Sequence, residues 1–309
     1  MNFNIIPLNI KKSLNYLIIL FPLTFVVGNA GINLNLFIIS ILGVILYKKE
    51  IFKIEKNLIL FSIIFFFIFV IISTLVDLYE NSYNSNLIRS ILYLRYLIFL
   101  LVLNCMVKKN DFNFKYFLLS CLFCSIFVSS TVIFEGITGR PFLHYGSYVY
   151  HNSGIFRDEL ISGGYIQRFG CLGLFFIPLF LRTDKKRRLI FLTLALTFYS
   201  LSIILSGNRM PLLLFGTFLL LGLFFINKIR LPFFLGFIFS ILSFLIIINI
   251  DKNIRNHWSS FYINVSTSMF PGSELFFLDE LKKDHSDIKA KTDPKESTPG
   301  LEEGKFDYG

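Results

Sequence analysis

The chain has 309 residues, of which 54% are hydrophobic and 16% are charged, and its formal net charge is +10. A soluble domain has about a quarter charged residues, and its single core has no room for a long series of apolar helices. Apolar runs long enough to cross about 30 Å of hydrocarbon recur along this chain. The composition therefore excludes a soluble enzyme and predicts an all-α, polytopic membrane helix bundle.

The positive charge is distributed in a way that argues against nucleic-acid binding. Before residue 279 there are 24 Lys and Arg against 11 acidic residues, whereas the remaining residues hold 6 Lys against 9 acids. The basic excess thus lies in the membrane portion, where Lys and Arg set orientation rather than bind phosphate backbones. We expect membrane lipids as partners and no nucleic acid.

About nine transmembrane helices are predicted in chain order. The first two are close together and follow Lys11 and Lys12, so we interpret them as a retained helical hairpin and not as a cleaved signal peptide. The nine apolar runs are residues 13–29, 31–47, 57–78, 87–107, 115–135, 165–182, 189–205, 210–226 and 231–250.

The Lys and Arg residues alternate between the two sides of this arrangement. With a cytoplasmic N-terminus, the inner segments and their flanks carry 16 Lys and Arg, whereas the outer segments before residue 251 carry 3. Cytoplasmic loops are the ones enriched in Lys and Arg. The pattern therefore predicts nine spans with the N-terminus in the cytoplasm.

Three features outside the apolar runs are predicted on the outer side. Residues 136–164 form an outer loop too long for a simple connection, and Ser206-Gly207-Asn208-Arg209 forms a tight hairpin. Residues 251–309 form a periplasmic segment, whose charged, Pro- and Ser-containing end is expected to be partly disordered. We thus expect a bundle at 1–250 and, after it, the start of a truncated large loop.

The four cysteines all fall inside apolar runs. Cys121 and Cys124 form a C-x-x-C pair, but no His or acid lies near them in the run. They are interpreted as small apolar helix residues. No metal-ligand spacing or Gly-rich phosphate loop occurs, so neither a metal nor a cofactor is expected.

Arginine rather than lysine is used at the outer side. Arg95 lies deeper in the fourth run, about 9 Å along the axis from Arg89. Ionisable groups at membrane depth are costly and tend to mark a pathway or ligand site, and the arginine fork suits phosphate oxygens. Snorkelling toward lipid headgroups is the alternative for Arg89 and Arg168. The outer arginines before the C-terminal segment are Arg89, Arg140, Arg157, Arg168 and Arg209.

The end of the long outer loop, residues 151–168, combines base, acid and cation. Asp158 and Glu159 are candidates for a general base toward a sugar hydroxyl. They are equally candidates for helix N-terminal acids or for ion-pair partners of nearby arginines. His151 is a further catalytic candidate and His144 another, although surface histidines are more common than catalytic ones.

Two short patterns resemble the O-antigen ligase/polymerase family of bacterial envelope glycosyltransferases. The first is G-x-F-x-D-E-x-x-x-G-x-Y-x-x-R at residues 154–168, and the second is S-G-N-R-x-P at 206–211. The L-R-Y run at 94–96 is also similar. The resemblance covers roughly residues 10 to 270 in helix order.

The resemblance implies metal-independent glycan transfer at the periplasmic face of the bacterial inner membrane. The donor would be a glycan on undecaprenyl pyrophosphate, and the acceptor another glycan or a lipid. Arg95, Arg157, Arg168 and Arg209 would hold the pyrophosphate, and Asp158, Glu159 or His151 would activate the acceptor hydroxyl. No acid lies near Arg209 in the sequence, so an anionic ligand is its expected partner.

Two other function classes stay open at this point. A transporter or flippase of lipid-linked sugars would commonly show internal repeats, and none is found. A non-catalytic membrane subunit of envelope polysaccharide assembly fits a chain that ends in a charged segment. Family members usually continue with a large periplasmic loop carrying a functional His and with further helices. The resemblance therefore implies either that this chain lacks its C-terminal part or that the acceptor half of the site is supplied differently.

Overall fold

The computed structural model of the protein is helical throughout its described part and has no β-strand there. It describes residues 5–52, 58–81, 84–140, 142, 151–156, 159–180, 184–250, 254–256 and 258–259. The chain divides into a compact unit, Met1–Asp251, and a second unit, Lys252–Gly309. All elements discussed below belong to the first unit.

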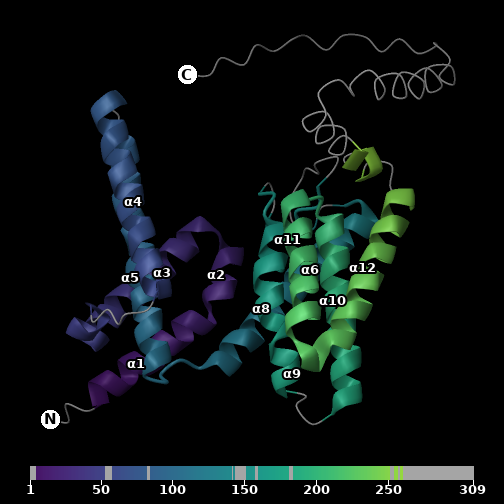
Figure 1. The fold of residues 1–309 in the computed structure, drawn as a ribbon, viewed down its shortest axis with the longest axis horizontal. Helices are drawn as coiled ribbons and strands as arrows, with labels where there is room; N and C mark the ends of the chain where they lie inside the picture. The colour runs from purple at the N-terminus through teal and green to yellow at the C-terminus, as the bar shows by residue number, and fades with distance from the viewer. Residues whose placement is uncertain are drawn as a thin grey trace. The chain divides into compact units, whose positions relative to one another are not determined.

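The first five α-helices form one group with its own core. They are α1 (Ile5–Ile19), α2 (Phe21–Val27), α3 (Asn29–Tyr47), α4 (Leu58–Asn81) and α5 (Asn84–Lys108), with a 3-10 turn at Lys48–Phe52. α5 packs against α3 and α4, and α3 packs against α1 and α2 (Figure 1). Leu14, Ile39, Val102 and Met106 are fully buried between them. The predicted N-terminal hairpin is present, and its turn lies at Gly28, which adopts a φ of +106°.

The remaining helices form a second group. They are α6 (Phe114–Thr138), the broken segment α7 (Ser162–Tyr165), α8 (Cys171–Leu174) and α9 (Phe176–Phe180), then α10 (Lys185–Leu205), α11 (Arg209–Phe225) and α12 (Arg230–Ile250). Short 3-10 turns lie at Gly154–Phe156 and Asn227–Ile229. α10 contacts α6, α11 and α12, and these helices run side by side in Figure 1.

The sixth predicted run is a broken helix. α7 continues into a π-helical turn at Ile166–Gly170, and α8 and α9 follow. Glycine is the least favourable non-proline residue in a helix interior, and π turns occur as single-turn irregularities. Gly173 has a second role, since a Cβ there would lie 2.6 Å from the Leu122 backbone nitrogen and Cα. Gly173 thus lets this segment approach α6 closely.

Each of the nine predicted apolar runs is largely helical over its described residues. By the length and composition of its helices, the protein is a multi-pass membrane protein. In the described part, six helices are long and apolar enough to cross a membrane. The pair Asn9–Ile19 and Phe21–Val27, bent by 52°, counts as a seventh if its two helices form one span rather than a re-entrant loop. Leu60–Val76 and Arg209–Phe225 are shorter apolar helices, so the predicted count of nine stays a prediction.

The outward surface of the helices suits lipid. Large apolar side chains are widely exposed, among them Leu58, Phe225 and Ile250, each at least three-quarters exposed. Soluble monomers rarely expose contiguous apolar patches of this extent. Because helices satisfy their backbone groups internally, such a surface is compatible with a hydrocarbon environment.

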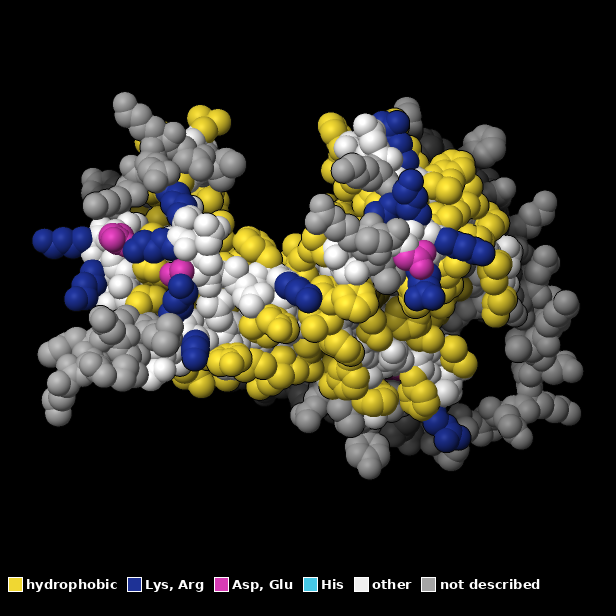
Figure 2. Space-filling view, turned by 90° about the horizontal axis from the view of Figure 1, so that it is seen from below, with side chains coloured by type: hydrophobic (Ala, Val, Ile, Leu, Met, Phe, Trp, Pro, Cys, Tyr) yellow, Lys and Arg dark blue, Asp and Glu magenta, His cyan; other side chains and the backbone are white. Residues whose placement is uncertain are grey.

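Chain segments that the sequence assigns to the same side of the membrane are in contact. Lys11 pairs with Asp111, and Lys109 pairs with Glu50, so three of the predicted inner segments meet. Asn152 and His151 of the predicted outer loop contact the end of α10. Figure 2 shows Lys and Arg side chains spread over one face, with a few acidic side chains among them.

Candidate functional site

The end of the long loop lies against the end of α10. The Asn152 side-chain nitrogen donates a hydrogen bond to the Leu205 carbonyl oxygen at 2.5 Å. His151 Nδ1 lies 3.3 Å from the Ser206 carbonyl oxygen. These carbonyls belong to the last turn of a helix and the residue after it, where no intrahelical donor remains. The loop therefore provides hydrogen-bond partners for the Leu205 and Ser206 carbonyl oxygens, at the start of the 206–209 hairpin.

Two adjacent glycines bring α7 into contact with the same hairpin. A Cβ on Gly163 would lie 2.4 Å from Ser206 Oγ and 2.9 Å from the side chain of Asn208. A Cβ on Gly164 would lie 3.9 Å from Pro211. Position 163 thus admits no side chain unless the Ser206 or Asn208 side chain is displaced. The two sequence patterns, which are some 40 residues apart, are packed against each other.

Glu135, near the end of α6, holds the loop segment 151–156 by a hydrogen bond to its backbone. Its carboxylate is 1% exposed, and Oε2 accepts a hydrogen bond from the Gly154 backbone nitrogen at 2.6 Å. Gly154 has a φ of +60°, and a Cβ there would lie 2.6 Å from Thr131 Oγ1. The backbone conformation and the close approach to α6 both favour glycine.

Sequence reasoning missed Glu135, although a signal was present. It is the single acid of α6 and lies in the last turn of the helix, where the helix dipole disfavours negative charge. A buried carboxylate is costly unless it is hydrogen-bonded. We define the motif cluster as Glu135, residues 151–154, Gly163, Leu205 and the hairpin 206–209.

The hairpin itself presents polar groups at the start of α11. Gly207 adopts a φ of +72°, and the Asn208 backbone nitrogen donates to Ser206 Oγ at 3.4 Å. The Asn208 side-chain nitrogen is buried and makes no hydrogen bond with a described residue. Arg209 is the first residue of α11 and is partly buried. The helix dipole of α11 and the charge of Arg209 therefore both contribute positive potential at the N-terminal end of α11.

Arg209 is engaged within the chain, so it is not the isolated cation that its sequence neighbourhood suggested. Arg168 is exposed in the π-helical turn, and this turn contacts α11. The two arginines thus come from elements that are in contact, and the convergence of their guanidinium groups stays a prediction. Arg157 lies outside the described residues.

Arg95 belongs to the first helix group. Its guanidinium lies over the ring of Tyr96, with Cζ 5.0 Å from the centroid, and Nη2 donates to the Tyr96 hydroxyl at 3.3 Å. Nε is buried without a hydrogen bond to a described residue. An aromatic face partly compensates such a cation. Convergence of its guanidinium with those of Arg168 and Arg209 stays a prediction.

The catalytic candidates differ in their surroundings. His151 belongs to the motif cluster. Glu159 is exposed, makes no ion pair with a described residue, and donates its backbone N–H to the Phe156 carbonyl oxygen at 3.1 Å. Asp158 lies outside the described residues. Of the three, His151 is the one placed against the S-G-N-R hairpin.

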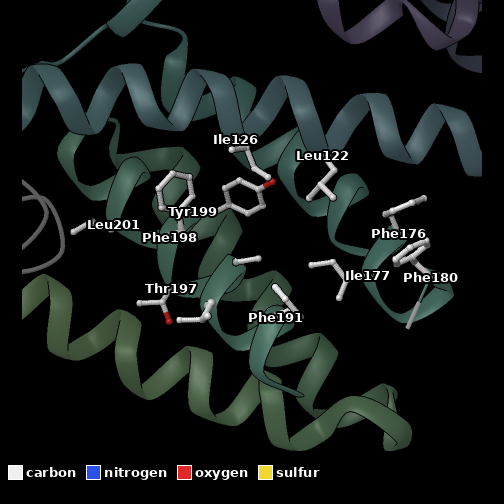
Figure 3. A pocket seen from close by; sticks show the side chains of 12 residues that line it. Leu122, Ile126, Phe176, Ile177, Phe180, Phe191, Thr197, Phe198, Tyr199 and Leu201 are labelled. Atoms are coloured by element: carbon white, nitrogen blue, oxygen red, sulfur yellow. The ribbon is translucent and has the colours of Figure 1, made fainter. Parts of the chain in front are cut away.

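An apolar pocket of about 700 Å³ lies between α6, α9 and α10 (Figure 3). Its α10 side runs from Phe191 to Leu201, about 15 Å at 1.5 Å per residue. The rings of Phe176 and Phe180 stack at one end, 5.6 Å apart. The Tyr199 hydroxyl lies 2.7 Å from that of Ser125, so this buried polar group is satisfied.

Family models, curated proteins and solved structures contain no match to this chain.

Proposed function

We propose that this protein transfers or polymerises a glycan carried on undecaprenyl pyrophosphate at the periplasmic face of the bacterial inner membrane. Its N-terminus is cytoplasmic, which puts the motif cluster on the periplasmic side. The basic helix ends that meet through Lys11, Asp111 and Lys109 then lie on the cytoplasmic side, as expected for Lys- and Arg-rich segments.

The observation that carries the proposal is the contact between the two sequence patterns. Gly163 of the first pattern meets Ser206 and Asn208 of the second, and His151 and Asn152 bond the same hairpin. Packing alone does not require a histidine, an asparagine and an arginine to lie together at the start of one helix. An assembled polar site at the mouth of a bundle is what a transfer reaction on a membrane-anchored donor needs.

The proposed chemistry divides between the arginines and the loop. Arg209 and Arg168 bind the pyrophosphate, and the N-terminal end of α11 adds positive potential. The acceptor hydroxyl oxygen attacks the anomeric carbon while the bond from that carbon to the pyrophosphate oxygen breaks. Undecaprenyl pyrophosphate leaves with the bonding electrons. The arginines supply the charge stabilisation, so the reaction is proposed as metal-independent.

His151 is the preferred candidate for the general base. When the ring proton is on Nδ1, the Nδ1–H donates a hydrogen bond to the Ser206 carbonyl oxygen, and Nε2 keeps a lone pair. Nε2 can then accept the proton of the acceptor hydroxyl. Glu159 and Asp158 are the alternatives on the same loop.

The apolar pocket beside α10 suits the lipid part of the donor. Leu201, at one end of its lining, precedes Ser206 by five residues, which is about 7.5 Å along the helix. A polyprenyl chain lying along α10 would leave its pyrophosphate near the start of α11. The pocket holds part of such a chain, and the rest would extend into the bilayer.

The test is transfer from an undecaprenyl-pyrophosphate oligosaccharide by the complete protein in vitro. Arg209→Lys keeps the charge and loses the bidentate fork, so transfer should fall by about a hundredfold, as for other charge-stabilising donors. Arg140→Lys, at an exposed outer arginine, is the matched control and should leave transfer unchanged. Near-normal transfer by Arg209→Ala would show that Arg209 is a headgroup anchor.

A flippase for lipid-linked sugars is the second candidate, and one observation favours it. Two spans are discontinuous, and the discontinuities meet: Phe21 and Phe25 at the break of the first span pack on Phe169 of the π-helical turn. Broken helices that meet are common at transporter sites. Movement of a fluorescent lipid-linked oligosaccharide across liposomes, without glycan transfer, would select this candidate.

A further inference from the structure

A second pocket lies where α1 meets the turn between α5 and α6. It has a volume of about 470 Å³, within the range of small-molecule sites. One wall is a stretch of α1 from Lys11 to Ile19. The other wall is formed by Asn110 to Asn113 and Tyr116. The pocket is lined by none of the motif-cluster residues.

A polar network fixes the walls of this pocket. Asn15 donates its side-chain N–H to the Asp111 carbonyl oxygen at 2.7 Å and accepts from the Asn113 backbone nitrogen at 3.0 Å. The Asp111 carboxylate pairs with Lys11 and accepts from the Tyr47 hydroxyl at 3.0 Å. We call these residues, together with the Lys109–Glu50 pair, the turn network. The site is therefore built before any ligand arrives.

The charge that this network leaves at the pocket is positive. Asp111 is the one acid among the described residues that line it, and Lys11 and Tyr47 already engage its carboxylate. Lys12 also lines the pocket, is exposed, and forms no ion pair with a described acid. The pocket thus offers an ammonium group, with amide groups of Asn110 and Asn113 on the opposite wall. This donor set suits an anion.

The pocket also changes from polar to apolar along α1. Lys12, Tyr16 and Ile19 line it at spacings of four and three residues, so they share one helix face. From Lys12 to Ile19 the axis advances about 10 Å. Tyr16 and Tyr116 are 66% and 52% exposed, as expected of aromatic residues at a membrane interface. A free phosphate would use only the Lys12 end.

We propose that this pocket binds the headgroup phosphate of an anionic phospholipid. The phosphate lies at Lys12 and the two asparagines, the glycerol backbone passes between Tyr16 and Tyr116, and the acyl chains begin beside Ile19. Basic pockets between transmembrane helices are known to take such headgroups. The proposal holds whether or not the protein transfers glycans.

The experiment measures lipid binding to the full chain in neutral detergent by native mass spectrometry. The probes are dioleoyl-phosphatidylglycerol, dioleoyl-phosphatidylcholine and inorganic phosphate. Phosphatidylglycerol should bind best, and Lys12→Gln should weaken it roughly five-fold, the effect expected of one lysine near anionic lipid. Lys12→Arg should keep the affinity. Lys186→Gln, at another exposed lysine, is the matched control and should also keep it.

Each other outcome overturns the proposal in a distinct way. Equal binding of phosphatidylcholine would mean a general lipid contact. Inorganic phosphate binding as tightly as phosphatidylglycerol would mean a plain anion site. An equal loss for Lys12→Gln and Lys186→Gln would mean diffuse surface charge. Because Lys12 is exposed, a folding defect is not expected to obscure these results, and circular dichroism of each variant checks this.

Discussion

The motif cluster and the turn network both join segments that are distant in the sequence, but through different kinds of interaction. In the motif cluster a carboxylate 1% exposed and a glycine without room for a side chain fix the geometry. In the turn network the Lys109–Glu50 pair is partly in water, with side-chain exposures of 45% and 47%. Buried hydrogen bonds impose one arrangement, whereas exposed ion pairs are weak and adjustable. A reacting centre needs the first kind of joint, and a lipid-facing pocket tolerates the second.

The largest effect on stability is expected from Glu135→Ala. It removes the acceptor of the Gly154 N–H and leaves that donor buried, which should lower the free energy of unfolding by about 2–3 kcal/mol. Thermal unfolding in detergent measures this. Glu135→Gln retains an acceptor oxygen and should lose clearly less. A loss below about 0.5 kcal/mol for the alanine variant would show that the loop is not held by this bond.

A smaller effect on stability, but a strong one on transfer, is expected from Gly163→Ala. The added methyl displaces Ser206 or Asn208, with an overpacking cost of about 1–2 kcal/mol. Transfer should fall much more than the stability loss explains, because the hairpin that carries Arg209 moves. Gly216→Ala in α11 is the control, since nothing lies within 4 Å of its Cβ. If both variants transfer normally, the contact between the two patterns is only structural.

The smallest effect is expected from Lys109→Ala in the turn network. The Lys109–Glu50 pair is half exposed, so its loss should cost about 0.5 kcal/mol or less. The same unfolding assay at low and high salt measures it, and the difference from the unaltered chain should shrink as salt rises. A salt-independent loss above about 1 kcal/mol would place this pair with the buried contacts and would weaken the comparison.

The sequence predicted the helical segments well because the membrane imposes one rule on all of them. Every apolar run must satisfy its backbone internally, so run length and composition suffice. The breaks were harder to predict. Pro22 and Gly170 were visible, but whether such a residue breaks, bends or only packs a helix depends on its neighbours, here Phe169 and the Tyr199 ring.

The site was predicted unevenly for a similar reason. The loop end at 151–168 gave His151 and the second pattern gave Arg209, both by residue type. The contact between the two patterns runs through Gly163, whose role becomes visible only in space. Glu135 was missed because it lies outside both patterns. Its position near the end of a membrane helix was a signal, but its partner, the Gly154 backbone N–H, cannot be identified from residue types. Arg95 was grouped by charge with the others, whereas its guanidinium lies on its own neighbour, Tyr96.

The order of synthesis gives a further meaning to the contact at the break of the first span. Tyr165 donates its buried hydroxyl to the Pro22 carbonyl oxygen at 2.9 Å, across 143 residues. The ribosome delivers α1 and α2 long before α7, so the acceptor is in the bilayer when the donor arrives. A hydroxyl entering hydrocarbon is costly until it finds a partner. The first helices thus present a hydrogen-bond acceptor for a helix that is synthesised later. A chain shortened at its N-terminal end would lose the Pro22 carbonyl that accepts the Tyr165 hydroxyl.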